Sequence, residues 1–237
     1  MSETAAPEVD LLGHIVLAAC AALEEAQEEL CRLDAVAGDG DEGFAMAGAA
    51  RGVRAQLAKA PPHDAVALLD LVATQFSAVG GTMGALSFVL FRALSQAPGV
   101  GEKPLSADLI AQLLAIAEDS VSAFGEAKRG DKTIIDAIAG ARDAANACAL
   151  SNKTASATLT GSAEAAVRAA AQTADMVPRI GRASRLADSS RGTIDPGAQS
   201  FAIVLSALAH AYATVTGSDG PGTKPGHEAA TPRPGGD

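Results

Sequence analysis

A glycine-rich turn near the start of the chain contains the residues whose types and spacing best suit metal binding. Asp34, Asp39 and Asp41 lie within eight residues, interspersed with glycines. Carboxylates this close repel one another, and a hard divalent cation removes that cost, because Mg²⁺ prefers oxygen ligands. The glycines allow the tight bend that brings the side chains together. The turn therefore predicts a magnesium site, with a solvated acidic loop as the alternative.

Two further glycine-rich segments have features that suit phosphate binding. Residues 80–84 read GGTMG and open an apolar segment. Backbone N–H groups at a helix start hold anions, although a Gly-Gly pair between helices is more often a packing turn. Residues 125–133 differ by one intruding residue, Asp131, from the phosphate-binding pattern GxxxxGK[ST]. Because no strand precedes them, we reject that motif and expect Asp131 to cap, or lie near the cap of, the following helix.

A basic segment completes the set of motifs. Residues 179–191 carry four arginines in 13 positions, in a chain whose net charge is −10. Arginine suits phosphate because its planar fork of donors matches the oxygens. Surface arginines that balance acidic loops are the alternative. Taken together, the acidic turn, the two glycine-rich turns and the basic segment suggest a metal–nucleotide site built from loops.

The scaffold that must position these loops is predicted to be all-α. Hydrophobic residues make up 48% of the chain and aromatic residues only 3%, so Ala, Leu, Val and Ile must form the core, and Ala favours helices. Residues 218–237 are rich in Pro and Gly and predict a disordered tail. Apolar periodicity predicts one domain, residues 8–217, with eight helices over about residues 9–33, 44–59, 64–79, 82–96, 106–125, 133–150, 162–176 and 198–216.

Composition also excludes several classes of protein. The chain has 18 basic and 28 acidic residues, which argues against binding nucleic acid or an anionic membrane. Residues 71–91 and 197–215 lack charges, but polar residues interrupt them, so we interpret both as buried helices. No signal peptide is visible and the three cysteines suit a reducing compartment, so we expect a cytoplasmic protein. No histidine lies at zinc-ligand spacing, and no serine-hydrolase motif occurs.

The motifs occur in the order and spacing of the L subunit of dihydroxyacetone kinase, which the chain resembles over about residues 10–215. The segments that carry the resemblance are Asp34 with Gly38-Asp39-Gly40-Asp41-x-Gly43, Gly80-Gly81-Thr82-x-Gly84, Gly130-Asp131-Lys132-Thr133, Gly181-Arg182-Ala183-Ser184 and Asp195-Pro196-Gly197-Ala198. The resemblance implies an antiparallel eight-helix barrel that binds ADP or ATP at one rim through two Mg²⁺ ions. It implies that Asp34, Asp39 and Asp41 are the metal-binding and catalytic residues. The nucleotide-binding positions that it implies are Glu42, Gly43, Ala45, Gly81, Thr82, Met83, Gly125, Ile134, Arg182, Asp195, Pro196 and Gly197.

The same resemblance implies a kinase that works as one subunit of a complex. In this family a separate K subunit holds dihydroxyacetone on a histidine, and the L subunit presents the phosphoryl donor. The acceptor is then dihydroxyacetone or a related keto-sugar such as a ketotetrose. The donor is ATP, or bound ADP that a phosphocarrier protein of a phosphotransferase system rephosphorylates. A role in glycerol metabolism follows from the family, and a homodimer stays open.

Three positions depart from the family pattern at the nucleotide side of the site. Glu42 and Ala45 stand where the family has a His and an Asn, and Met83 replaces a Ser. A carboxylate 4 Å from a phosphate charge costs about 4 kcal/mol at an effective dielectric near 20, so Glu42 either repels the nucleotide or becomes an extra metal ligand. The departures motivate an alternative function, a non-catalytic or regulatory homologue with an altered nucleotide site.

Overall fold

The computed structural model describes residues 7–181, 183–184 and 190–217 of the chain. Residues 1–6, 182, 185–189 and 218–237, which include Arg182 and the predicted tail, lie outside the described residues. All regular elements of the described part are helical, as predicted. They are α1 Pro7–Glu25, α2 Gln27–Asp34, α3 Glu42–Lys59, α4 Ala65–Ser77, α5 Gly81–Ser95, α6 Ala107–Gly125, α7 Ile134–Leu150, α8 Ala155–Gln172, the 3₁₀ turn η1 Thr173–Asp175 and α9 Pro196–Thr216.

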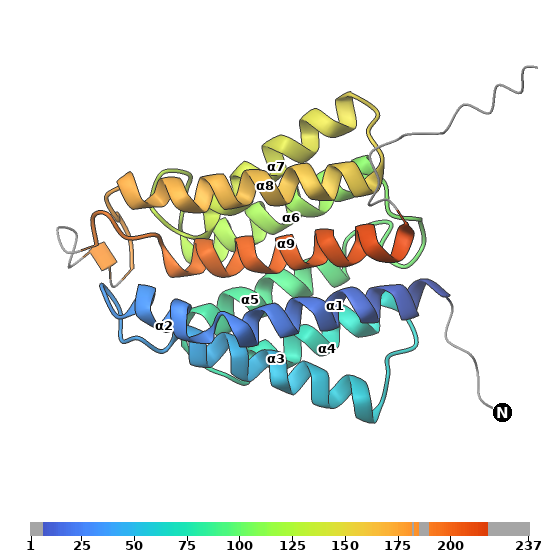
Figure 1. Cartoon of the computed structure of the whole chain (residues 1–237), viewed down its shortest axis with the longest axis horizontal. Helices are drawn as coiled ribbons and strands as arrows, with labels where there is room; N and C mark the ends of the chain where they lie inside the picture. Colours follow the sequence, from blue (N-terminus) through green and yellow to red (C-terminus); the bar gives the residue numbers. More distant parts are fainter. Residues whose placement is uncertain (1–6, 182, 185–189, 218–237) are drawn as a thin grey trace, which may run out of the picture.

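The helices close into a ring. Figure 1 views it from the side, with α1, α3, α8 and α9 in front of α5 and α6. Each helix from α3 onward packs against the next one in the chain, α1 packs against α3, and α9 returns to pack against α1. Because successive helices run antiparallel, α3, α5, α7 and α9 all begin at the same end of the ring. The loops that carry the predicted motifs precede these four helices, so the topology places them together.

Small side chains let the later helices approach closely. The core between α6, α7, α8 and α9 consists mainly of buried alanines. At Gly140 of α7 even a methyl group would be too large, because a Cβ there would lie 2.8 Å from the Cβ of Ala169 on α8. This packing explains how a chain with 3% aromatic residues builds a dense core.

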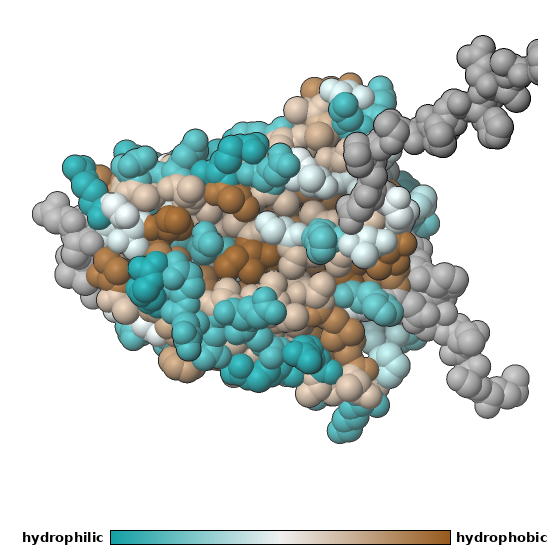
Figure 2. All heavy atoms as spheres, in the orientation of Figure 1, coloured by the Kyte–Doolittle hydropathy of each residue, from teal (hydrophilic) through white to brown (hydrophobic). Residues whose placement is uncertain are grey.

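An apolar cavity of about 270 Å³ lies inside the ring, away from the motif-bearing loops. It is lined by side chains such as Leu12, Val72, Phe91, Leu159 and Val204, from α1, α4, α5, α8 and α9. On the face shown in Figure 2, hydrophobic side chains gather along α9 and between α9 and α1, while hydrophilic side chains cover α8 and α3.

Helix α9 is the one described helix that is long and apolar enough, by length and composition, to cross a membrane. It packs against α1, α7 and α8 and buries residues along its length, among them Ala202, Leu205 and Ala209. A core helix passes the same test of length and composition. From the sequence we expected residues 197–215 to form a helix that packs against other helices, and α9 does so.

Two predicted helix boundaries were wrong. The first predicted helix divides at Ala26, whose ψ of 0° departs from helical geometry, so the described part contains nine α-helices instead of eight. Helix α8 begins at Ala155, seven positions before the predicted Ser162. Thr154 determines that start, because its Oγ1 accepts a hydrogen bond from the N–H of Ala157 at 3.2 Å.

A candidate metal and phosphate site at the rim of the ring

A second pocket of about 270 Å³ lies at the end of the ring where α3, α5, α7 and α9 begin. All the segments singled out from the sequence contribute to its lining, although up to 163 positions separate them along the chain, from Asp34 to Gly197. Its lining includes Asp34, Glu42, Thr82, Met83, Gly125, Lys132, Thr133, Ile134, Ile180, Gly181, Ala183, Asp195, Pro196 and Gly197.

Three carboxylates converge beside this pocket. One ligand oxygen from each of Asp34, Asp39 and Asp41 lies within 4.8 Å of the others. The side chain of Asp34 also shapes the turn, because its Oδ2 accepts hydrogen bonds from the N–H of Gly40 at 2.8 Å and of Asp41 at 3.1 Å. A Cβ at Gly38 would lie 2.0 Å from Asp34 Oδ1, so only glycine fits there. Three converging carboxylate oxygens are the donor set that Mg²⁺ prefers, and the residues present therefore fit a magnesium site.

Glu42 lies next to the aspartates but has a different partner. It is 7% exposed, and its Oε1 accepts a hydrogen bond from Ser200 Oγ of α9 at 2.9 Å. Burial raises the pKa of Glu42 to about 8, despite the opposing hydrogen bond from Ser200, and the charges of Asp195, Asp34 and Asp41 raise it further. At neutral pH the carboxyl group is therefore mostly protonated and adds little negative charge. Among the described residues, the group of converging ligand oxygens contains the three aspartates and not Glu42.

Four helix N-termini at the rim supply positive potential, each equivalent to about half a unit charge. Thr133 and Asp195 cap α7 and α9 through their side chains, whereas α3 and α5 begin without a side-chain cap. Gly80 and Gly81 start α5 with φ of 71° and 68°, which is why glycines are needed there. The first-turn N–H groups of α5 are thus donors that a phosphate can use.

Three predicted nucleotide-binding residues from three helices meet at the pocket. A Cβ at Gly197 would lie 3.4 Å from Met83 Sδ and 3.5 Å from Ile134 Cβ, so these residues approach one another closely. Asp195, at the start of α9, accepts a hydrogen bond from the N–H of Ala198 at 2.8 Å. Burial raises the pKa of Asp195 to about 7, with Asp136 and Asp34 acting in the same direction and Lys132 against it.

Some predicted residues lie elsewhere or contribute differently. Gly43 faces α2, because a Cβ there would lie 1.9 Å from the backbone oxygen of Gln27, and Ala45 packs against the core of the first helices. Gly81 contributes backbone conformation at the start of α5 and does not line the pocket. Arg182, the one predicted arginine, lies outside the described residues.

Asp131 lies near the cap of α7, two residues before it, and is not the cap itself. Thr133, not Asp131, is the N-cap residue, and it forms a capping box with Asp136, whose Oδ2 accepts a hydrogen bond from the N–H of Thr133 at 2.9 Å. Asp131 is instead 2% exposed and accepts a hydrogen bond from the N–H of Lys128 at 3.0 Å. Sequence reasoning also missed Lys132 as a site residue. The resemblance to a phosphate-binding lysine was visible, but the partners of its ammonium group were not.

Comparison with known proteins identifies the family. A model of the DAK2 domain matches residues 36–210. The L-erythrulose 1-kinase of Mycolicibacterium smegmatis is 40% identical over 187 residues, which is 77% of this chain and 32% of that protein. The dihydroxyacetone kinase of Citrobacter freundii is 31% identical over 204 residues, 84% of this chain and 35% of that protein.

A solved structure shows the same fold. The crystal structure of the dihydroxyacetone kinase from C. freundii in complex with AMP-PNP and Mg²⁺ matches with a TM-score of 0.67 at 27% sequence identity. The match covers 89% of this chain and 36% of that one. The chain thus spans about a third of the length of the relatives that it matches. Since the domain model covers well over half of the sequence and the fold agrees, the chain belongs to the DAK2 domain family.

Proposed function

We propose that this chain is the nucleotide- and magnesium-binding subunit of a cytoplasmic kinase that phosphorylates a short keto-sugar. We base the proposal on three converging carboxylates, of which Asp34 lines the pocket, together with the uncapped start of α5, where Thr82 and Met83 line the same pocket. Membership of the DAK2 family supports it, as do relatives named kinases. The order of the motifs supports a role in glycerol metabolism only through the resemblance to dihydroxyacetone kinase.

Different residues at the pocket would bind the metal and the phosphates of a nucleoside triphosphate. Asp34, Asp39 and Asp41 would hold Mg²⁺, two ions by the resemblance, and the metal supplies charge neutralisation for the phosphates. The first-turn N–H groups of α5, next to Thr82 and Met83, donate to phosphate oxygens. Glu42 is buried, and its carboxyl group accepts a hydrogen bond from Ser200 of α9 instead of joining the converging aspartates. Positioning and electrostatics of this kind supply most of the catalysis in phosphoryl transfer.

The sugar acceptor needs a binding site that the matched third of the relatives is not proposed to supply. The relatives are about three times as long as the match, which leaves room in those proteins for a second unit. By the resemblance, we propose that a K-type unit holds the sugar at the rim of the pocket. The erythrulose kinases are 36–40% identical to this chain, against 31% for the dihydroxyacetone kinase of Citrobacter freundii. The acceptor is therefore a ketotetrose or dihydroxyacetone, and the K-type unit decides between them. The donor is ATP, or bound ADP rephosphorylated by a phosphocarrier protein.

The second candidate function is a regulatory homologue that keeps the fold but binds nucleotide weakly. Met83 favours it, because a thioether occupies the pocket beside Gly197 where the family has a hydroxyl donor. Ala45 favours it as well, because its side chain packs into the core and offers no polar group.

Asp39→Ala tests the first proposal. With a K-type subunit and erythrulose or dihydroxyacetone present, this variant should lose phosphoryl transfer, while circular dichroism shows an intact helical fold. Asp108→Ala is the matched control, because Asp108 is exposed at the start of α6, at the opposite end of the ring. Transfer by the Asp39 variant at the wild-type rate would contradict the assignment.

A further inference from the structure

Lys132 is a buried lysine at the edge of the candidate site. The residue is 5% exposed, and its side chain lines the pocket. Its Nζ donates hydrogen bonds to the backbone oxygens of Thr173 at 2.7 Å, Ser190 at 2.9 Å and Thr193 at 2.7 Å. An ammonium group has three N–H donors, so these carbonyls use all of them. Lys132 is therefore not available to bind phosphate as a P-loop lysine does.

The three acceptors lie at the two ends of one segment. Thr173 follows α8, whereas Ser190 and Thr193 precede α9. The ammonium group thus joins the ends of the segment 173–195, and two backbone N–H groups of the described residues do so as well. The N–H of Gly192 donates to Ala174 O at 2.9 Å, and the N–H of Asp195 donates to Thr173 Oγ1 at 2.8 Å.

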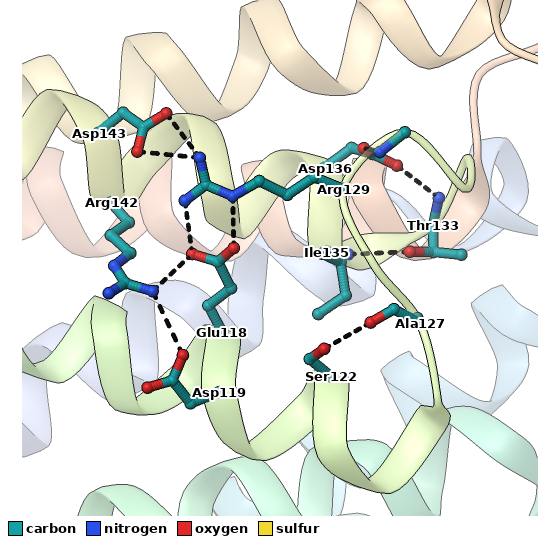
Figure 3. A network of polar contacts seen from close by, with 11 residues as sticks. Glu118, Asp119, Ser122, Ala127, Arg129, Thr133, Ile135, Asp136, Arg142 and Asp143 are labelled. Atoms are coloured by element: carbon teal, nitrogen blue, oxygen red, sulfur yellow. Dashed lines mark hydrogen bonds and ion pairs between the residues drawn. The ribbon is translucent and has the colours of Figure 1, made fainter.

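The loop that carries Lys132 is itself held firmly, as Figure 3 shows. Arg129 forms ion pairs with Glu118 of α6, with bonds of 2.5 and 2.8 Å, and with Asp143 of α7, with bonds of 2.9 and 3.1 Å. The carboxylate of Asp136 accepts hydrogen bonds from the N–H groups of Gly130 at 2.5 Å and Thr133 at 2.9 Å. The loop 126–133 is therefore a rigid support between α6 and α7.

The backbone of Lys132 is strained in a way that agrees with this role. Its φ is 61°, in the left-handed region that a residue with a Cβ adopts at a cost. Such conformations persist where the surroundings determine them strongly. Here the three acceptors on one side and the capping box of α7 on the other do so.

The segment 173–195 contributes four of the residues that line the pocket. Ile180, Gly181, Ala183 and Asp195 line the pocket from it. It also contains the arginines of the basic motif. We propose that Lys132 is a positioning residue. Its ammonium group holds the two ends of the segment 173–195 together and thereby positions the pocket-lining residues of that segment against the nucleotide. The part of the proposal that concerns the nucleotide rests on the function proposed above.

Lys132→Met tests the proposal, with two readouts on the full chain. Hydrogen–deuterium exchange of the amides of Gly192 and Asp195 should accelerate at least about tenfold, as expected for losing one charge-assisted hydrogen bond, while exchange in α3 and α4 stays unchanged. The dissociation constant for ATP with Mg²⁺, measured by calorimetry, should rise by a similar factor. Lys128→Met is the matched control and should change neither, because Lys128 is exposed on the same loop.

Lys132→Arg is the rescue variant, and it also serves if Lys132→Met does not fold. Its guanidinium group keeps the charge and offers donors to the same carbonyls, so it should recover most of the protection and of the affinity. Weaker ATP binding with unchanged exchange in Lys132→Met would mean that Lys132 contacts the nucleotide, and would overturn the proposal. Faster exchange with unchanged affinity would overturn it too. If the wild-type chain binds no ATP, the proposed function fails, and the exchange data alone decide whether Lys132 holds the segment.

Discussion

At the scale of single residues, Glu42 shows how the surroundings decide the role of a carboxyl group. From the sequence it could be a repulsive charge beside a phosphate or an additional metal ligand. The structure shows a buried group that accepts a hydrogen bond from Ser200, with its pKa raised to about 8. Ser200 is 158 positions away along the chain, so no local pattern could have predicted this partner.

The raised pKa of Glu42 predicts a pH dependence of stability. The folded chain keeps a proton that the unfolded chain releases above its ordinary pKa of 4.5. Its contribution is therefore fully present below about pH 4.5 and is lost as the pH rises towards 8, by at most about 1.4 kcal/mol per pH unit. In EDTA, the melting temperature of the wild type should fall more steeply between pH 5 and pH 8 than that of Glu42→Gln. Parallel curves for the two proteins would contradict a buried, protonated Glu42.

Met83 separates the two candidate functions. Met83→Ser restores the hydroxyl group of the family pattern at a position that lines the pocket. If the wild-type chain is the donor subunit of a kinase, its affinity for ATP is already sufficient, and calorimetry should show less than about a tenfold gain, or 1.4 kcal/mol. A larger gain would favour the regulatory homologue.

At the scale of elements, the predictable features were those that depend on neighbouring residues. The apolar spacing predicted the helices, among them residues 106–125. Ser106 caps this helix, α6, by accepting a hydrogen bond from the N–H of Leu109 at 3.2 Å. The aspartate cluster was predictable because all three residues share one short turn. The contacts of the Lys132 ammonium group were not predictable, because its acceptors lie 41, 58 and 61 positions away along the chain. They are also backbone oxygens, which carry no sequence signal.

Gly43 yields a prediction about how α3 meets α2. Its implied role was nucleotide binding, but the structure places the backbone of Gln27 where a side chain would be, 1.9 Å from a Cβ. Gly43→Ala should therefore destabilise the protein by about 1–3 kcal/mol, as overpacking does, in urea unfolding. Gly48→Ala, on the same helix, is the matched control, because the nearest atom would lie 3.7 Å away. It should be neutral or stabilising by up to about 1 kcal/mol, and equal losses in both variants would show that close packing is not the reason for Gly43.

At the scale of the whole molecule, the proposed function requires a chain with a net charge of −10 to attract a polyphosphate. Four helix N-termini at one rim of the ring supply positive potential there, and the carboxylates beside them can bind a divalent cation. We propose that residues 8–217 form this single domain, as the periodicity predicts. Because the positive potential from helix ends alone is weak, we expect nucleotide binding to depend on the metal.

The most direct test of this account is a calorimetric titration of ATP, and then ADP, into the full chain with Mg²⁺ and again with EDTA. We expect clear binding of nucleotide with Mg²⁺, and loss of that binding both in EDTA and in the Asp39→Ala variant with Mg²⁺. Absence of binding with Mg²⁺ present, or equal binding in EDTA, would contradict the claim that the three aspartates and the start of α5 form a magnesium–nucleotide site.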